Sequence, residues 1–379
     1  MKMNFETVYG WVRDLPIVDW HNHLDLEWIA ADRPLGSLYE VWVKADPYKH
    51  RAMRICGEDE RVITGEASED EKWSAWTRTL PKLVGNPVFA WAEQELAFLR
   101  KELGLTADDL SIAHLQNVSL AALTPKKLLK AFNVEYYDPG YRLNIGDALD
   151  TAQLDAIAAR GGRVIDVSAD SLDSLDSADF QMIHNVGREA IARGWTMLLH
   201  LGALRETSSR LRELAGSAGG FAGMRAPVDP QKVAEILNAL EAAKVLPRTI
   251  LLSLNPEAHA QLAVLAGSFN GAGLPGKVQL GPAWWWCDHE EGIRDVLEKN
   301  AAYGVLSTFI GMTTDSRSLL SFVRHDYFRR VLCKWTIEKV ASGSFPDDEA
   351  LMRPLLENIC YRNAHRAIFD EPVRREAAL

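Results

Sequence analysis

The residues best suited to chemistry are two histidines one position apart, His21 and His23, which end the apolar run Pro16–Trp20. Side chains alternate along a strand, so residues two apart face the same side. Two imidazoles on one side can bind one metal ion and leave open the positions that a catalytic site needs. The pair therefore predicts a metal-dependent enzyme, although two such histidines also occur in structural roles.

Several other reactive residues stand at the ends of apolar runs in the second half of the chain. In parallel α/β folds, functional side chains cluster at the carboxyl ends of the strands. Their position along the predicted strands therefore groups these residues with the two histidines. The set comprises His200, Arg205, Trp284, Trp285, Asp288, Asp315 and Arg317.

The residue types in this set favour a small anionic substrate that is rich in oxygen. Asp315 adds a carboxylate to the two imidazoles, and a bound ion would polarise a carbonyl or activate water. Arg205 and Arg317 suit a substrate carboxylate, because the planar guanidinium binds both oxygens. Other interpretations stay open: His200 is a metal ligand, a substrate contact or a core histidine. Asp315 and Arg317 could pair with each other and cap a helix, and the tryptophans could be core.

The elements that must position these residues alternate between strand and helix. Near-continuous apolar strands indicate a parallel sheet. We therefore predict an α/β fold, a (β/α)8 TIM-type barrel. An open doubly wound sheet is the alternative, because the number of strand–helix units does not exclude it. The predicted strands are Ile17–His21, Asn133–Tyr137, Arg163–Ser168, Thr196–Leu201, Thr249–Leu254, Lys277–Gly281 and Val305–Ile310, with an eighth near Tyr141–Asn144. The predicted helices are Ala148–Ala159, Ile183–Arg193, Pro230–Ala243, Pro256–Ala266 and Gly292–Tyr303.

Residues 1–379 are expected to form a single barrel domain with one large insertion. The stretch 38–129 breaks the alternation, is helix-rich, and is predicted to cover the barrel mouth after the first strand. The tail, Ser321–Phe369, is predicted to be helical and to close the barrel. Its basic cluster, Arg324–Arg330, is interpreted as a solvated or salt-bridged helix face, with Arg324 as a residue that could turn toward the site.

Composition excludes several classes of protein. The chain has 379 residues, 47% of them hydrophobic, and a formal net charge of −10, with no dense stripe of Lys and Arg to indicate nucleic-acid binding. No apolar run approaches the roughly 20 residues that span a bilayer, and no signal peptide is expected. The four cysteines are widely spaced, which favours reduced thiols and a cytoplasmic location. The oligomeric state stays open, a homo-oligomer included.

The chain resembles the uronate isomerases (glucuronate/galacturonate isomerases) of the amidohydrolase superfamily, as a shortened and divergent member. From about Trp195 onward the similarity is nearly continuous, whereas the first half matches in patches. The Thr-Thr-Asp-Ser-Arg motif and the stretch that follows it are the most specific. The matching stretches are Ile17–Leu24, Tyr48–Arg54, Leu199–Arg205, Leu246–Leu251, Gly276–Trp285, Gly311–Ser318, Arg324–Cys333 and Ile359–Ala364.

The resemblance implies a distorted barrel that binds one divalent ion, zinc or manganese, through His21, His23 and Asp315. It implies aldose–ketose isomerisation of a hexuronate, either D-glucuronate to D-fructuronate or D-galacturonate to D-tagaturonate. Asp315, Tyr48 and Arg317 would be catalytic, with Asp315 or water beside it as the base that forms an enediol. The implied substrate contacts are Arg205, Arg142, Arg54, Trp284, Trp285, His50 and His200.

Two departures from the family pattern bear on the reaction. Pro47 stands where the family has a histidine beside the substrate, and proline has no N–H to donate. Ala90 replaces a second histidine, while His50 would reach the site only if its loop bent inward. A metal-dependent hydrolase or lyase acting on a related sugar acid or lactone is therefore the alternative. A catalytically silent sugar-acid-binding protein is the third interpretation.

Overall fold

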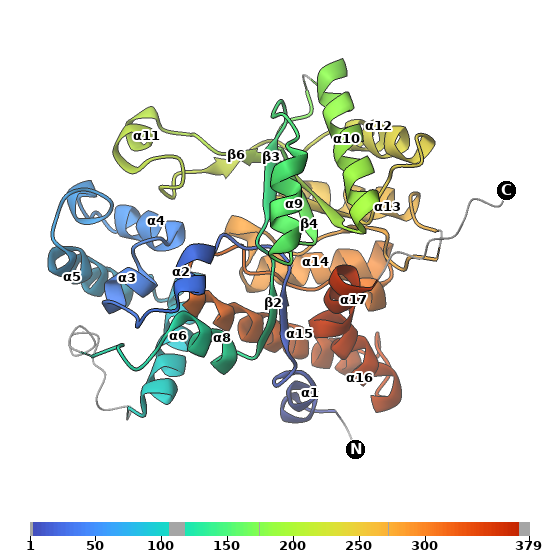
Figure 1. The fold of residues 1–379 in the computed structure, drawn as a ribbon. Helices are drawn as coiled ribbons and strands as arrows, with labels where there is room; N and C mark the ends of the chain where they lie inside the picture. The colour runs from blue at the N-terminus through green and yellow to red at the C-terminus, as the bar shows by residue number, and fades with distance from the viewer. Residues whose placement is uncertain (1–2, 106–117, 174, 272, 371–379) are drawn as a thin grey trace.

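The computed structural model describes residues 3–105, 118–173, 175–271 and 273–370, and these residues form an α/β fold with parallel strands at its centre (Figure 1). A short sheet pairs β1 with β2, and a five-stranded sheet follows in the order β3-β4-β5-β8-β9. All of these pairings are parallel. The strands are β1 Ile17–Asp19, β2 Val134–Tyr137, β3 Tyr141–Asn144, β4 Val164–Ala169, β5 Thr196–Leu201, β8 Thr249–Ser253 and β9 Val278–Leu280.

The strands enclose an apolar interior, which identifies the fold as a barrel. Val18 of β1, Leu198 of β5 and Ile250 of β8 belong to one buried cluster, together with Ile310. Neighbouring residues on the same strands, such as Leu199, belong instead to the cluster formed with the surrounding helices. This alternation is what a two-residue side-chain period produces. The predicted (β/α)8-type barrel is confirmed, in a distorted form.

The distortion lies in the last wall of the barrel. The prediction of a strand over Val305–Ile310 is wrong, because residues Leu306–Thr308 form a 3-10 turn. The chain beyond this turn is held by single polar contacts instead of a ladder. The Ile310 N–H donates to the Gln279 side chain at 2.8 Å, and the Asp315 N–H donates to the His21 carbonyl at 3.1 Å.

Amphipathic helices cover the outside of the five-stranded sheet, and their buried residues form one core with the outward faces of the strands. The helix that precedes β5 begins at Ser177, six residues earlier than predicted, because Asp176 caps it in a reciprocal capping box. The helices are α9 Thr151–Ala159, α10 Ser177–Arg193, α12 Pro230–Ala242, α13 His259–Gly267 and α14 Glu290–Tyr303. Between β5 and α12 lie β6 Ala203–Leu204, α11 Ser209–Ala215 and β7 Gly223–Met224.

The stretch predicted as an insertion is helical over its described part, and residues 106–117 of it lie outside the described residues. Its helices form a lobe beside the barrel, at the left of Figure 1, with a core around Trp42, Trp73 and Trp76 that Leu319 and Phe322 join. Inside this lobe Lys49 bonds both Asp46 and Glu95. The helices are α3 Leu38–Trp42, α4 Pro47–Ile55, α5 Glu69–Thr79, α6 Pro87–Leu103 and α8 Pro125–Ala131, preceded by α2 Leu26–Ala31.

Helices from the two ends of the described chain pack together under the barrel (Figure 1). The predicted helical tail is confirmed, and Ala367 and Ile368 of its last helix join the apolar interior of the barrel. The Thr196 hydroxyl donates to the Ala367 carbonyl at 3.2 Å, at the start of β5. These helices are α1 Phe5–Val12, α15 Val323–Ala341, α16 Glu349–Glu357 and α17 Asn363–Phe369.

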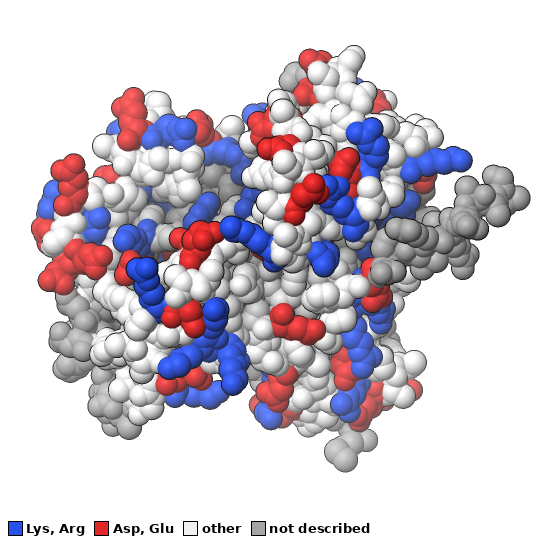
Figure 2. All heavy atoms as spheres, in the orientation of Figure 1, with Lys and Arg blue, Asp and Glu red and all other residues white. Residues whose placement is uncertain are grey.

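Acidic and basic side chains are intermingled over the face that Figure 2 shows. Within the described ranges, no helix is both long enough and apolar enough to cross a bilayer. The four cysteines are free thiols.

The last wall also depends on Gly311, which has a φ of +78° and lies against α16 and its extension. A Cβ added there would lie 2.0 Å from the Ile359 carbonyl oxygen. We expect Gly311→Ala to lower the free energy of unfolding by about 3 kcal/mol or more, through strain and a backbone clash. Urea denaturation measures this change.

Gly343→Ala is the matched control, because Gly343 has a φ of +79° with open space around its Cβ position. Its cost should be about 1 kcal/mol, from the left-handed backbone alone. Equal losses in the two variants would contradict the close packing of the last wall.

Candidate active site

Asp315 brings the two histidines of the opening motif together. His21 Nε2 and His23 Nε2 each lie 3.0 Å from the same oxygen, Asp315 Oδ1. The strand ends at Asp19, two residues earlier than predicted, so both histidines sit in the segment that follows β1. That segment is fixed by the last wall, because the His23 N–H donates to the Ser316 carbonyl at 2.8 Å. The spacing and the donor atoms fit one divalent ion.

Asp315 itself is held in an unusual conformation. Its φ is +48°, in the left-handed region, and its second oxygen accepts a 2.8 Å hydrogen bond from the Trp284 indole. Burial opposes ionisation, but the hydrogen bonds from His21 and His23 outweigh it and hold the pKa of Asp315 well below its usual range. Burial lowers the pKa of His23 to about 4. An ionised carboxylate and a neutral imidazole are the forms in which these groups bind metal.

A second group of polar residues adjoins the first through His21. Asp166 on β4 accepts a hydrogen bond from His200 Nδ1 and lies 3.7 Å from His21 Nδ1. Burial raises the pKa of Asp166, but the charge and hydrogen bond of His200 outweigh it and bring the pKa down to about 2. His200 Nε2 is buried without a hydrogen-bond partner. Among the described residues His200 is therefore only partly satisfied, and its ring lies 4.9 Å from the His21 ring and 4.3 Å from the Trp284 ring.

Arg142 also reaches this region. Its Nη2 donates to the Asn22 carbonyl, and its Nε lies 3.9 Å from Asp166 Oδ2. The sequence did not single out Asp166. The available signal was a charged residue inside the otherwise apolar run of β4, since such residues are rarely buried without a partner.

Tyr48 approaches the barrel from the insertion. It lies at the start of α4, where Asp46 caps the helix, and its hydroxyl donates to Asp288 Oδ2 at 3.0 Å. Asp288 also forms an ion pair with Arg324, whose guanidinium lies 5.3 Å from the centre of the Tyr48 ring. Burial raises the pKa of the Tyr48 hydroxyl above its usual range, so Tyr48 keeps its proton near neutral pH.

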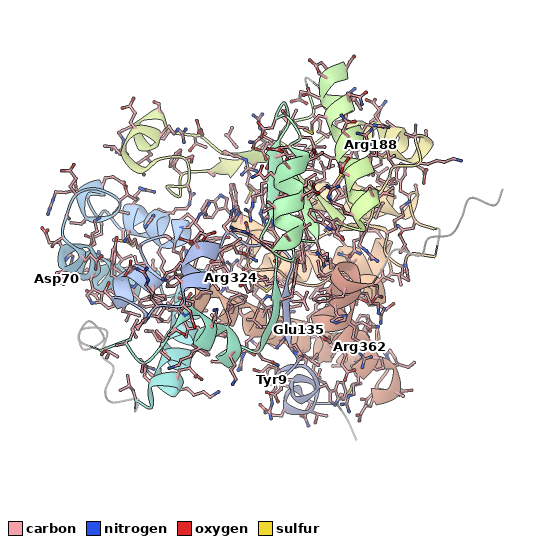
Figure 3. The ribbon with its side chains drawn as sticks, viewed as in Figure 1. Tyr9, Asp70, Glu135, Arg188, Arg324 and Arg362 are labelled. Atoms are coloured by element: carbon pink, nitrogen blue, oxygen red, sulfur yellow. The ribbon has the colours of Figure 1, made fainter. Side chains whose placement is uncertain are left out.

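Arg324 lies near the middle of the molecule, between the insertion and the barrel (Figure 3). The interpretation of its cluster as a solvated face is wrong, because Arg324, His325 and Arg329 are buried. The salt-bridged part of that interpretation holds for Arg324 and Arg330, which pair with Asp288 and Asp326.

The two arginines expected to meet a substrate carboxylate differ in their contacts. Arg205 lies 5.4 Å from the ring centre of Trp285 and already forms an ion pair with Asp170. Arg317 is half-buried, and within the described ranges it forms neither an ion pair nor a hydrogen bond. The suggestion that Arg317 pairs with Asp315 to cap a helix is therefore wrong. Ser318 caps the turn that follows.

His50 and Arg54 contact other parts of the protein than the candidate site residues described above. Helical side chains two residues apart project about 200° from each other, so His50 points away from the side on which Tyr48 meets Asp288. Arg54 is occupied by Glu60 and by the Gly219 carbonyl. Their predicted contact with substrate gains no support from this arrangement.

Comparison with known proteins identifies the family. The profile of the glucuronate isomerase family matches residues 2–138 and 148–368. The uronate isomerase of Salmonella paratyphi B is 31% identical to this chain, with 93% of each chain aligned. The chain belongs to the glucuronate isomerase family.

Two solved structures share the fold of this family member. The uronate isomerase of Thermotoga maritima superposes with a TM-score of 0.80 at 23% identity, covering 97% of this chain and 98% of that one. The glucuronate isomerase of Caulobacter crescentus superposes with a TM-score of 0.80 at 17% identity, covering 99% and 96%. The barrel and its helical lobe are thus those of solved isomerases.

The departures from the family pattern fall on the insertion helices. Pro47 occupies the first position of α4, where a missing N–H costs nothing and the fixed φ suits the helix. Ala90 lies in the first turn of α6. The proline therefore favours the helix that carries Tyr48, while the polar side chain that the family has at this position is absent.

His50 provides a test of how this lobe is packed. It is buried, and among the described residues no carboxylate forms an ion pair with its ring. Burial lowers its pKa to about 4, against about 6.5 in the unfolded chain. The unfolded state therefore binds a proton first as the pH falls. We expect His50 to cost about 2–3 kcal/mol of stability between pH 7 and pH 4.5.

His50→Gln should remove this part of the acid destabilisation, which denaturant unfolding at the two pH values measures. A variant that loses as much stability on acidification as the wild type would show that His50 is not buried in its neutral form.

Proposed function

We propose that this chain catalyses the aldose–ketose isomerisation of a hexuronate, D-glucuronate or D-galacturonate, with one divalent ion, zinc or manganese. The observation that carries the proposal is the position of Arg317, which pairs with no other described residue, two residues from Asp315. Asp315 lies 3.0 Å from both His21 and His23. Two imidazoles and a carboxylate would hold the ion. The ion would polarise the sugar oxygens at C1 and C2.

Substrate binding and proton transfer are then carried out by side chains of the protein. Arg317 binds the substrate carboxylate, because its guanidinium has no partner in the described part of the chain. Asp315, or water beside it, accepts the proton from C2 and returns it to C1. The hydroxyl proton of O2 passes to O1 through the enediol, so the ketose forms with no net change in protons. Tyr48 turns its single O–H from Asp288 to the enediolate oxygen, while the guanidinium of Arg324 holds its ring in place. Such acid–base help supplies about 10²–10⁴-fold.

Other side chains shape the pocket around this centre. Trp284 fixes Asp315 and stacks with Trp285 at a ring separation of 5.1 Å. Arg205 lies on the Trp285 ring, where it would contact the far end of the sugar. We include His200 and Arg142 as substrate contacts, since both reach Asp166 beside His21. We further propose that residues 1–379 form one cytoplasmic domain with 38–129 as its insertion.

Metal content tests the ligands. The wild-type chain loaded with zinc or manganese should hold one ion, whereas Asp315→Asn and His23→Ala should bind it at least about tenfold more weakly. His289→Gln is the matched control, because His289 bonds only Glu291 and its own helix start. Elemental analysis after dialysis against a competing chelator gives the answer. Undiminished metal in both ligand variants would refute the site.

A substrate panel tests the reaction. The loaded chain should convert D-glucuronate or D-galacturonate to the ketouronate, and Arg317→Ala should lower kcat/KM by about 10- to 100-fold. Arg212→Ala, which removes an exposed arginine paired with Glu206, should leave kcat/KM unchanged. Several aldonolactones belong in the panel. Opening of a lactone without formation of a ketouronate would replace the isomerase by a hydrolase.

A further inference from the structure

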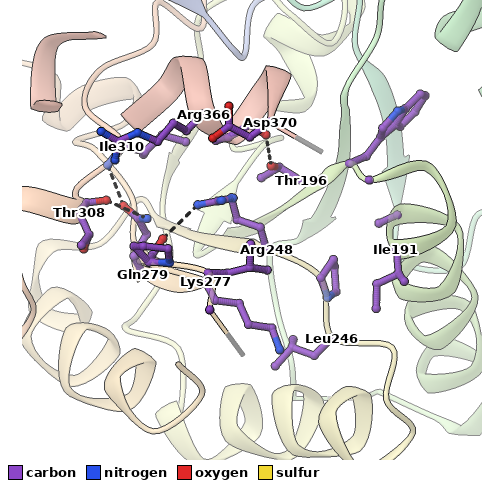
Figure 4. Close-up of a pocket in the computed structure, with 18 of the residues that line it drawn as sticks. Ile191, Thr196, Leu246, Arg248, Lys277, Gln279, Thr308, Ile310, Arg366 and Asp370 are labelled. Carbon is purple, nitrogen blue, oxygen red and sulfur yellow. Dashed lines mark hydrogen bonds between the residues drawn. The ribbon is translucent and has the colours of Figure 1, made fainter. Parts of the chain in front are cut away.

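A cavity of about 580 Å³ is lined by residues at the starts of several strands (Figure 4). Three of its lining residues directly precede strands: Trp195 before β5, Arg248 before β8 and Lys277 before β9. His200 stands near the far end of β5. Because the strands are parallel, the cavity faces their amino ends and the metal site their carboxyl ends. The two sites are therefore separate.

Four cationic side chains line this cavity: Lys244, Arg248, Lys277 and Arg366. Within the described ranges, none of the four forms an ion pair. Arg248 donates only to the Pro275 carbonyl at 3.2 Å. Arg366 reaches only asparagine side-chain oxygens, at 3.4 and 3.5 Å.

This lack of partners contrasts with other arginines of the chain. Arg193 bonds Glu189 and Asp155, and Arg294 bonds Glu290 and Glu338. The whole chain carries an excess of ten negative charges, so unused carboxylates are plentiful. Four cations thus line this cavity without an ion pair among the described residues, and two of them, Lys244 and Arg366, are exposed.

The surroundings of Arg248 disfavour its own charge. Burial lowers its pKa, and the positive charge of Arg366 lowers it further, while Asp370 offsets only part of this. Glu241 and Asp370 are the two carboxylates among the described lining residues, and both are exposed. A partly buried cation in this situation gains from an anion that enters the cavity. Arginine in particular matches the oxygens of a phosphate through its planar fork.

Part of the rest of the wall is apolar. Trp195, Leu246 and Ile310 are buried and line the cavity together with Ile191 and Leu274. Gln279 is already committed, since it donates to two carbonyls and accepts from the Ile310 N–H. The volume falls within the roughly 300–1,000 Å³ of small-molecule sites. The cavity thus offers cations for one end of a ligand and apolar surface for its body.

We propose that this cavity is a second binding site, for a small phosphorylated metabolite whose phosphate lies among Lys244, Arg248, Lys277 and Arg366. The site is independent of the isomerase reaction, because none of these residues contacts the metal-ligand group. A phosphate dianion matches the number of unpaired cations better than a single carboxylate does.

Calorimetric titration of the full chain with glycerol 3-phosphate and with inorganic phosphate tests the proposal. Both should bind, and glycerol in sodium chloride of equal ionic strength should not. Arg248→Ala/Lys277→Ala should weaken phosphate binding by about 10- to 100-fold. Arg61→Ala/Arg78→Ala removes the same two positive charges from exposed pairs in the insertion and should leave the affinity unchanged.

A second variant guards against a folding defect at the partly buried Arg248. Lys277→Ala/Arg366→Ala removes two side chains that hold no carboxylate, and it should also weaken phosphate binding about tenfold. Wild-type affinity in both cavity variants would overturn the proposal. Loss of binding in the Arg61/Arg78 control would overturn it too, since the effect would then be net charge. So would a cavity covered by a second copy, seen by sedimentation as a dimer that phosphate does not bind.

Discussion

Asp315 joins the first and last walls of the barrel. One of its oxygens lies 3.0 Å from both His21 and His23, and the other accepts from Trp284. Because β1 has three residues and the last wall has no strand, a few polar contacts replace the ladder that would otherwise hold these walls. The same contacts that complete the fold thus gather the metal-binding donors. This coupling explains why Asp315 tolerates a left-handed backbone, a strain of about 1–3 kcal/mol.

Buried charged side chains around Asp315 are paired with neighbouring side chains. Among the described site residues, Arg317 differs. Asp166 is held by His200, and Asp288 by Arg324 and Tyr48. Burying such groups is costly unless each finds a partner. Arg317 has none within the described residues, so it is the group to which an anionic ligand brings the largest gain.

Much of this arrangement follows from sequence pattern. Strands β4, β5, β8 and β9 are apolar runs between glycine, proline and polar boundaries, so their positions could be predicted closely. Val305–Ile310 is also an apolar run but contains a 3-10 turn, and the Ile310 N–H donates to the Gln279 side chain instead of to a neighbouring strand. The sequence pattern does not indicate Asp166 as a site residue, because its partner, His200, lies 34 residues away. Burial of Arg324 by the insertion likewise has no local signature.

Anomalous diffraction from crystals of the zinc-loaded chain measures the central claim most directly. The account predicts one zinc peak within about 2.0–2.2 Å of His21 Nε2, His23 Nε2 and an oxygen of Asp315. A peak bound by other donors, or none at this junction in a crystal that holds zinc elsewhere, would contradict it.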